Sequence, residues 1–488
     1  MKKNILLSLI LLNIISVSLA QVTISQGAPG TFTLEKGTEF MSFSKGGNYC
    51  FIEKKSKMAE KIYTMMVCDK NGNVNVAGEI KMNQGVFNNF YNINEFAVLD
   101  DKLLVFINNP NKETGKNTLA IRTLDNTATL SKEETTVGVI DFKKMNNQGF
   151  WRMAVSPDKK HLAVIAQLPF EKEQPSKFKF YFFDAGLKKI KEGEFALPGE
   201  GDKASLQCYT SDKGDLFLTK DKYEKGNLIP TIYQTSISDP AVKEFNVLLT
   251  APQKVFNYAT TVSPAGDLIV AGYYHENKAI TSGETKAKGV WIYNSSVKDA
   301  KVSPYTNLIE NLTPRGFVFN GNTAFFIGES FKEERETNTA SGAGAFDYNY
   351  KYTQKEIVVT AFDNASWSKK FDVTLNKNSQ GMNFNQDLFP AYGVINGKLA
   401  VVYNDRYGKY FPKDSYYAEY KLPVLNFVTN DGLLEQPIHF EKEFQIPPPR
   451  NVDAYTLYPM LFNNGMTNEI IMLSRYGNNF KGIVFRGK

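Results

Sequence analysis

Residues that could carry enzyme chemistry are few in this 488-residue chain. None of the three histidines, His161, His275 and His439, lies at metal-ligand spacing from another histidine or cysteine. The nucleophile-elbow, zinc-protease, phosphate-loop and dinucleotide-binding fingerprints do not occur in the sequence. We expect His161 to be structural and place His275 on a long loop, as the one histidine whose function is worth testing. The sequence therefore predicts no catalytic residue, no metal and no cofactor.

The segment from Asp69 to Asn73 places oxygen-bearing side chains at the first, third and fifth positions of a calcium-type loop. Its glycine is misplaced for an EF-hand, and no glutamate follows at the twelfth position. An ordinary hairpin turn is the better interpretation.

Aromatic side chains gather beside charged ones in two long connections, 329–355 and 404–421. Tyrosine and arginine are the residues most enriched in binding hot spots, because a rigid ring supplies contact area at low entropic cost. The candidate partner-binding residues are Arg335, Phe346, Tyr348, Tyr350, Tyr352, Arg406, Tyr407, Tyr410, Phe411, Tyr416 and Tyr417. Two alternatives remain open: the rings pack against one another, with 346–352 forming a hairpin extension that has one aromatic face, or they stack on carbohydrate.

Cysteines are too few, three in all, for a disulfide-stapled scaffold. Cys50 and Cys68 fall on consecutive expected strands, about equally far from the turn between them. A cross-strand disulfide and two buried free thiols are both compatible with this spacing.

The elements that must position these residues come from a repeated pattern. Eight times, an apolar run is followed by a turn of Gly, Asp, Asn or Pro and by a second apolar run, as in 152–165 and 258–271. A third apolar run and a more polar fourth run follow, and the turns mostly recur every 52–57 residues, from sequence counts. Four antiparallel strands repeated at this period are typical of a β-propeller. Long connections between the second and third strands are expected at 169–177, 220–228, 274–288, 329–355 and 404–421.

The chain end shows only three obvious strands, whereas 22–35 contains alternating apolar residues ahead of the first full repeat. We predict an all-β propeller of eight four-stranded blades, in which this N-terminal segment supplies the outer strand of the last blade and removes an open seam. Seven blades is the alternative count, and two packed β-sandwiches is the alternative architecture.

Two of the turns, Ser156-Pro157-Asp158 with the following HLAV and Ser263-Pro264-Ala265-Gly266-Asp267 with LIV, resemble the SPDGxxLAF repeat of TolB-like (PD40) propellers. The resemblance implies an exported propeller that binds proteins or peptides. The composition, rich in Lys, Asn, Phe and Tyr, together with the N-terminal leader of residues 1–20, also resembles that of Bacteroidota proteins. Exported propellers of that group are often accessory parts of outer-membrane machinery.

Residues 1–20 are predicted to be a cleaved signal peptide, with Lys2 and Lys3 before an apolar run and Ser18-Leu19-Ala20 before the cut. Residues 21–488 then form a single exported propeller domain without a membrane span, for which a periplasmic location is favoured over the cell surface. The formal charge of +6 falls to +4 when the two leader lysines are removed, and no basic block is present, so we expect no nucleic-acid partner.

The sequence thus predicts a non-enzymatic module that binds a protein partner, within an outer-membrane secretion or transport complex. The alternatives are a glycan- or peptide-acting hydrolase or lyase that uses a central funnel and needs paired carboxylates there, and a calcium-dependent adhesin.

Overall fold

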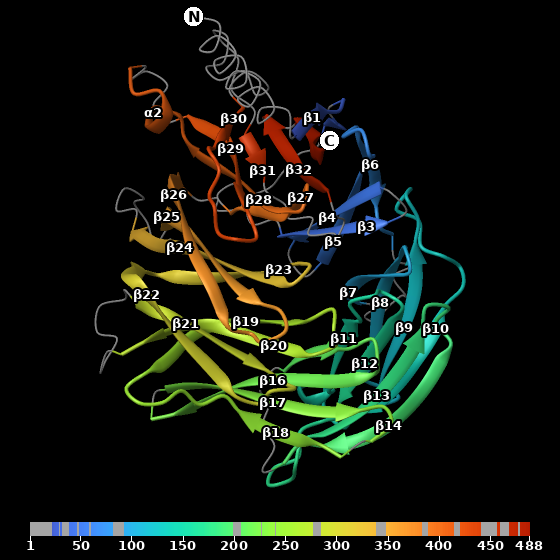
Figure 1. Cartoon of the computed structure of the whole chain (residues 1–488). Coiled ribbons are helices and arrows are strands. Elements are labelled where there is room, and N and C mark those ends of the chain that lie inside the picture. Colours follow the sequence, from blue (N-terminus) through green and yellow to red (C-terminus); the bar gives the residue numbers. More distant parts are fainter. Residues whose placement is uncertain are drawn as a thin grey trace, which may run out of the picture. The chain divides into compact units, whose positions relative to one another are not determined.

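The protein consists almost entirely of β-strands in the computed structural model (Figure 1). The structure describes residues 22–488 apart from 29, 32–38, 46–47, 58–59, 82–91, 199–205, 226, 240, 277–284, 338–347, 383–388, 414–419, 441–455, 459–467 and 477–478. The predicted signal peptide lies outside the described residues. Among the described residues, no helix is long and apolar enough to span a bilayer.

Successive strands form antiparallel four-stranded sheets in chain order. The strands of the first four sheets are β3 (Glu39–Lys45), β4 (Asn48–Lys57), β5 (Glu60–Cys68), β6 (Val74–Glu79); β7 (Asn92–Leu99), β8 (Lys102–Asn111), β9 (Lys116–Leu124), β10 (Thr135–Asp141); β11 (Phe150–Val155), β12 (His161–Gln167), β13 (Lys177–Asp184), β14 (Lys189–Ala196); β15 (Gln207–Thr210), β16 (Asp215–Glu224), β17 (Asn227–Ser236), β18 (Lys243–Asn246).

The strands of the next three sheets are β19 (Lys254–Val262), β20 (Leu268–His275), β21 (Lys286–Asn294), β22 (Ala300–Glu310); β23 (Leu312–Asn320), β24 (Thr323–Thr337), β25 (Tyr348–Asp363), β26 (Lys369–Met382); β27 (Ala391–Ile395), β28 (Lys398–Arg406), β29 (Lys421–Val428), β30 (Ile438–His439). The last sheet contains β31 (Thr456–Tyr458), β32 (Glu469–Tyr476), β33 (Asn479–Gly487) and the N-terminal strands β1 (Val22–Gln26) and β2 (Gly30–Thr31). Two short helices are described, the 3-10 turn η1 (Met145–Asn147) and α2 (Tyr407–Tyr410).

These eight repeats, counted over the described residues, are the blades of a β-propeller, as the sequence predicts. A single register pair, Leu228 with Val255, links two of the blades into one longer sheet. By compactness the chain divides into a first unit (1–77, 320–364 and 370–488) and a second unit (78–319 and 365–369), and each is described by itself.

Neighbouring blades of the second unit bury each other's faces. Phe106 from β8 and Trp151 from β11 belong to one apolar cluster with Leu162 and Val164 from β12. Burying one such side chain contributes about 1.5–3 kcal/mol, and a blade cannot cover both of its own faces alone.

The same backbone hydrogen bonds close the repeated turn in two of the blades. In the Ser156 turn, the Lys159 amide donates to the Ser156 carbonyl at 2.9 Å and the Ser156 amide donates to the His161 carbonyl at 3.0 Å. In the Ser263 turn, the matching bonds come from the Gly266 amide (2.9 Å) and the Ser263 amide (2.8 Å). Gly266 has a φ of +93° there, a conformation that favours glycine.

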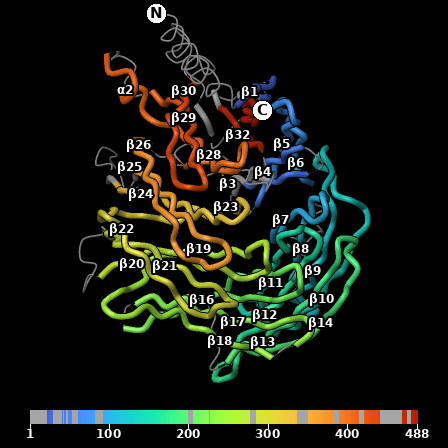
Figure 2. The backbone as a smooth tube through the Cα atoms, viewed as in Figure 1, coloured from blue at the N-terminus to red at the C-terminus, as the bar shows by residue number. Residues whose placement is uncertain are grey.

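The N-terminal strand pairs with the C-terminal one within the first unit. Val22 to Gln26 of β1 pair antiparallel with Gly487 to Ile483 of β33, and Figure 2 shows the blue segment β1 beside the marker of the C-terminus. The predicted contribution of the N-terminal segment to the last blade is therefore confirmed.

Some sequence-based boundaries are wrong. Residues 220–228 were expected to be a loop, but β16 continues to Glu224 and β17 begins at Asn227, so a tight hairpin replaces it. Most of 329–337 and 348–355 is likewise paired strand rather than loop. His275, expected on a long loop, is the last residue of β20 and is buried.

The possible Cys50–Cys68 disulfide is also not formed, because both residues are free buried thiols. Cys50 is opposite Val67 and Cys68 is opposite Tyr49. Since successive side chains alternate between the faces of a sheet, the two thiols point to opposite faces.

Candidate functional site

The paired strands β24 and β25 form a long hairpin with aromatic rings on one face. Their register runs from Thr323 opposite Asp363 to Thr337 opposite Tyr348. Tyr352 stacks between two neighbours, with ring centroids 5.9 Å from Phe331 and 6.4 Å from Tyr350.

The predicted residues of this hairpin differ in exposure. Tyr352 is 8% exposed, so this ring packs within the chain, as the self-packing alternative describes. Tyr350 is half-buried, and Arg335, its register partner, is exposed. Phe346 and the side chain of Tyr348 lie outside the described residues.

The second predicted group surrounds α2. Tyr407 is buried and stacks on Phe411 with 4.5 Å between ring centroids. The ring centroids of Tyr410 and His439 are 4.2 Å apart. Arg406, the last residue of β28, is half-buried. Tyr416 and Tyr417 lie outside the described residues.

A fully buried carboxylate, that of Asp405, holds α2 in place. One oxygen accepts from the Lys409 ammonium at 2.6 Å and the Tyr410 hydroxyl at 2.8 Å, and the other accepts the backbone amides of Asn378 and Arg406, both at 2.9 Å. Burial, with the nearby Tyr403 and Asp405, raises the pKa of the Tyr410 hydroxyl well above its ordinary value. Tyr410 therefore acts as a donor to Asp405 and not as an acid.

The base of the β24–β25 hairpin contains a fully buried ion pair. Lys377 from β26 lies 2.8 Å from the Glu329 carboxylate of β24, also donates to Gln354 of β25, and has its ammonium 5.7 Å from the ring centre of Tyr403 on β28. We call Glu329, Gln354, Lys377, Tyr403 and Asp405 the buried polar cluster. Strand β26 contacts the hairpin through Lys377, which binds Glu329, and contacts Asp405 through the Asn378 amide. The cluster therefore joins the hairpin to the base of α2 within the first unit.

Lys421, the first residue of β29, lies opposite Arg406 at the edge of this cluster. Burial, followed by the charge of Lys377, lowers the pKa of the Lys421 amine to about 8. None of Glu329, Lys377, Asp405 and Lys421 was singled out from the sequence. Isolated charged residues in polar strands give no local signal, and their partners are distant in the chain.

Four blades of the second unit begin with strands β7, β11, β15 and β19, and these strands carry few acidic residues. Glu95 is the one acidic residue among the described residues of β7, β11, β15 and β19. Burial raises the pKa of its carboxyl, and the smaller opposing effect of the Arg152 charge does not cancel this rise. A glycoside hydrolase needs a pair of carboxyl groups roughly 5–9.5 Å apart. These four strands do not supply that pair.

Asp69 and the histidines show no metal-binding arrangement. Both Asp69 oxygens accept hydrogen bonds from its own turn, from the Asn71 and Asn73 amides and the Asn73 side chain. Within the described part of the chain, no group of three or more His, Cys, Asp or Glu could hold a metal ion. His161 ends a hairpin turn and stacks on Phe182 at 5.5 Å, whereas burial and then Lys254 lower the pKa of His275.

The fold and these groups define the class of the protein: an all-β propeller with one extended aromatic hairpin and a buried polar cluster at its base. A scan against protein-family models gives no match, and a search of curated proteins gives none either.

Several solved structures superpose distantly on the chain. They include the β-propeller domain of the Trilobed protease from Pyrococcus furiosus, at 13% identity over 83% of this chain and 96% of that chain, with a TM-score of 0.36. The Pseudomonas brassicacearum lignostilbene dioxygenase matches at 8% identity, 84% and 90% coverage and a TM-score of 0.36. A mutant Synechocystis apocarotenoid oxygenase matches at 10% identity, 86% and 94% coverage and a TM-score of 0.35. Likeness of this degree says nothing about what this chain binds or catalyses.

Proposed function

We propose that this chain is an exported, non-catalytic propeller that binds a protein partner through the aromatic β24–β25 hairpin and the adjoining α2 segment. The observation that carries the proposal is the length of the hairpin, 15 and 16 residues in its two strands, combined with its stacked rings and exposed Arg335. A rigid strand pair that presents tyrosine and arginine is suited to protein recognition.

The buried polar cluster supports this proposal because it fixes the hairpin and α2 at their bases. An interface group that is already ordered loses less conformational entropy on binding. The single acidic residue on the first strands β7, β11, β15 and β19 favours binding over the hydrolase or lyase alternative. The hydrogen-bonded turn at Asp69 gives no support to a calcium-dependent adhesin.

The place of action in this proposal is the periplasm, within an outer-membrane assembly. Its support is the leader-like segment 1–20, the resemblance of the Ser156 and Ser263 turns to TolB-like propellers, and the resemblance of the composition and leader to exported propellers of Bacteroidota.

The test is a hairpin-shortened variant. Glu334 and Lys351 are register partners, so residues 335–350 can be replaced by Asn-Gly, which closes a two-residue hairpin turn. The variant lacks Arg335 and Tyr350 but keeps Phe331 against Tyr352. We expect it to fold with an unchanged far-ultraviolet spectrum and to lose the partner that the parent protein co-purifies from native envelopes, as measured by quantitative mass spectrometry.

The matched control is Tyr223→Ala, which removes a 69% exposed tyrosine from another hairpin, at the end of β16. It should co-purify the same partner in the same amount as the parent protein. Undiminished co-purification by the shortened variant would show that the hairpin is not the binding surface.

A further inference from the structure

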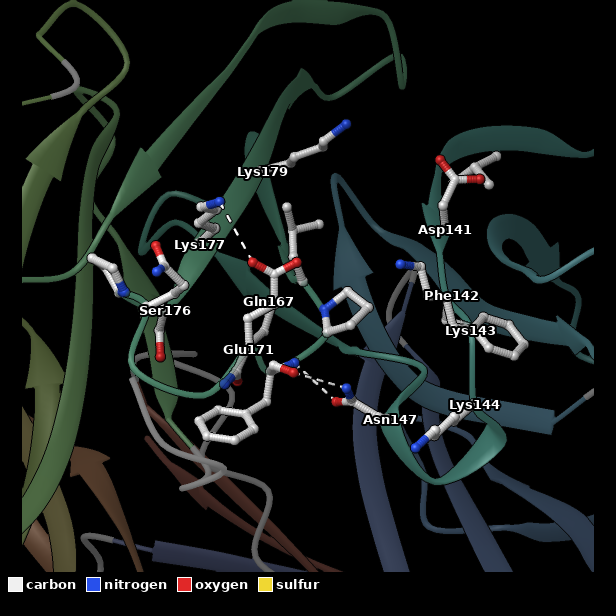
Figure 3. Close-up of a pocket in the computed structure, with 16 residues that line it drawn as sticks. Asp141, Phe142, Lys143, Lys144, Asn147, Gln167, Glu171, Ser176, Lys177 and Lys179 are labelled. Carbon is white, nitrogen blue, oxygen red and sulfur yellow. Dashed lines mark hydrogen bonds and ion pairs between the residues drawn. The ribbon is translucent and has the colours of Figure 1, made fainter. Parts of the chain in front are cut away.

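The second unit contains a pocket of about 530 Å³ that the proposed partner binding does not use. One wall is the end of β10 with η1, and the other is the connection between β12 and β13 with the start of β13 (Figure 3). This volume is within the range of about 300–1,000 Å³ that is typical of small-molecule sites.

Internal contacts hold the two walls in position. The Asn147 side chain donates to the Phe170 carbonyl and accepts from the Phe170 amide, both at 2.9 Å, and Figure 3 draws this pair of bonds. The Leu168 amide donates to the Lys177 carbonyl at 2.9 Å, which closes the base of the connection. The pocket is therefore preformed.

Apolar side chains and lysines share the lining. The apolar part consists of Val139, Phe142, Leu168, Pro169, Phe170 and Pro175. Lysines outnumber carboxylates around it, four against two: Lys143, Lys144, Lys177 and Lys179 against Asp141 and Glu171. Figure 3 shows Lys143 and Lys144 on one wall and Lys177 and Lys179 on the other.

The two walls differ in how their lysines are paired. Lys177 has a long contact of 3.9 Å with Glu171, and Lys179 lies 3.3 Å from Glu194 outside the pocket. The ammonium groups of Lys143 and Lys144 form no ion pair or hydrogen bond with any described residue. An anion in the pocket would therefore find two available positive charges beside an apolar surface.

We propose that this pocket binds a small organic carboxylate, with its aliphatic or aromatic body against Leu168, Pro169 and Phe170 and its carboxylate between Lys143 and Lys144. Lysine suits this role because its ammonium is a compact charge that can adjust its position to a single carboxylate. The apolar lining disfavours a fully hydrated ion such as phosphate, which would bury no apolar area there.

The first experiment is isothermal titration calorimetry of the full mature chain with 4-phenylbutyrate as the probe. Its alcohol analogue, 4-phenylbutanol, has the same apolar body without the charge, and inorganic phosphate has charge without the body. We expect 4-phenylbutyrate to bind at least tenfold more tightly than either, and its affinity to fall as salt rises. Equal affinity for the alcohol, or no binding of 4-phenylbutyrate, would overturn the proposal.

The second experiment locates the site with the double variant Lys143→Gln, Lys144→Gln. Both lysines are exposed and their side chains form no contact of the kinds above, so the variant should fold with the parent's melting temperature. We expect at least a tenfold loss of 4-phenylbutyrate affinity. The control Lys172→Gln changes an exposed lysine of the same connection that does not line the pocket, and it should bind like the parent. Retained affinity in the double variant would rule out this pocket as the carboxylate site.

Discussion

At the scale of single residues, Lys421 shows how the buried polar cluster changes a side chain's chemistry. Its amine has a pKa of about 8, because burial disfavours the charged form and Lys377 adds a second positive charge nearby. Lys377 itself keeps a direct carboxylate partner, Glu329, at 2.8 Å. Removing one member of such a buried pair typically costs about 3–5 kcal/mol, because the other charge is left buried alone. Glu329 thus stabilises the charge of Lys377, whereas the charged form of Lys421 is disfavoured in the folded protein.

Lys421→Met should stabilise the protein at neutral pH. Below pH 8 the lysine is charged in both the folded and the unfolded state, and the folded state bears a penalty of about 3 kcal/mol. Between pH 8 and the ordinary lysine value near 10.5, the folded amine has lost its proton while the unfolded one keeps it, so this contribution to stability rises with pH. The variant's gain in unfolding free energy should therefore be largest at pH 7 and should shrink towards pH 10.5, measured by urea unfolding.

Comparison with the parent at each pH is essential, because other groups titrate in the same range. Burial raises the pKa of Cys50 to about 11, a shift that acts in the opposite direction on the pH dependence of stability. Lys413→Met, at an exposed lysine after α2, is the matched control and should give a small difference that does not change with pH. A pH-independent gain for Lys421→Met would contradict the assignment.

At the scale of elements, Gly149 allows the segment after η1 to approach β12. Its φ is +76°, and a Cβ added there would lie 2.5 Å from the Gln167 carbonyl oxygen and 3.0 Å from Ile140. Asn147, two residues earlier, makes the pair of hydrogen bonds to Phe170. The glycine therefore positions one wall of the proposed carboxylate pocket.

Gly149→Ala should destabilise the protein by about 2–4 kcal/mol, since it combines the strain of a left-handed backbone with a clash against backbone. Gly397→Ala is the matched control: its φ is +69°, but nothing lies within 4 Å of an added Cβ. It should cost about 1 kcal/mol. The comparison is made by urea unfolding, and equal losses for both would mean that the close approach to Gln167 is unimportant.

The sequence predicts the elements well where apolar runs flank a turn with a defined backbone conformation. The Ser156 and Ser263 turns are hairpins in the structure because serine hydroxyls and residues at positive φ satisfy a tight reversal. Prediction of the strands from the sequence fails where the strands are polar. In 220–228, Lys220, Asp221 and Tyr223 give no apolar alternation, yet the backbone pairing of β16 with β17 continues to Glu224.

For the candidate site, the sequence identifies residue types but not their contacts. Tyr350 and Tyr352 were selected as tyrosines of a long connection, and they share one face of the hairpin, yet Tyr352 is buried against Phe331. Lys377 was not selected, because its partners Glu329 and Gln354 are 48 and 23 residues away and only the register of three strands brings them together. Long-range register is set by the whole sheet and leaves no trace in a local pattern.

At the scale of the whole molecule, the two chain ends meet in one blade of the first unit. β33 pairs with β32 on one side and with β1 on the other, and Gly30 and Thr31 of β2 pair with Phe480 and Asn479. Arg486 of β33 also lies 2.6 Å from the Glu469 carboxylate of β32. Without β1, the backbone groups on that side of β33 would become an open sheet edge.

Removing residues 1–31 should therefore lower stability and promote self-association, whereas removing residues 1–21 leaves β1 and β2 intact and serves as the control. We expect the longer truncation to lower the melting temperature by several degrees and to form oligomers, measured by thermal unfolding and light scattering, because the exposed edge of β33 can pair with another chain. A synthetic peptide of residues 22–31 added in excess should restore part of the lost melting temperature by occupying that edge. If the longer truncation melts like the control and stays monomeric, the pairing of β1 with β33 contributes nothing to stability, and the blade is complete with its three C-terminal strands alone.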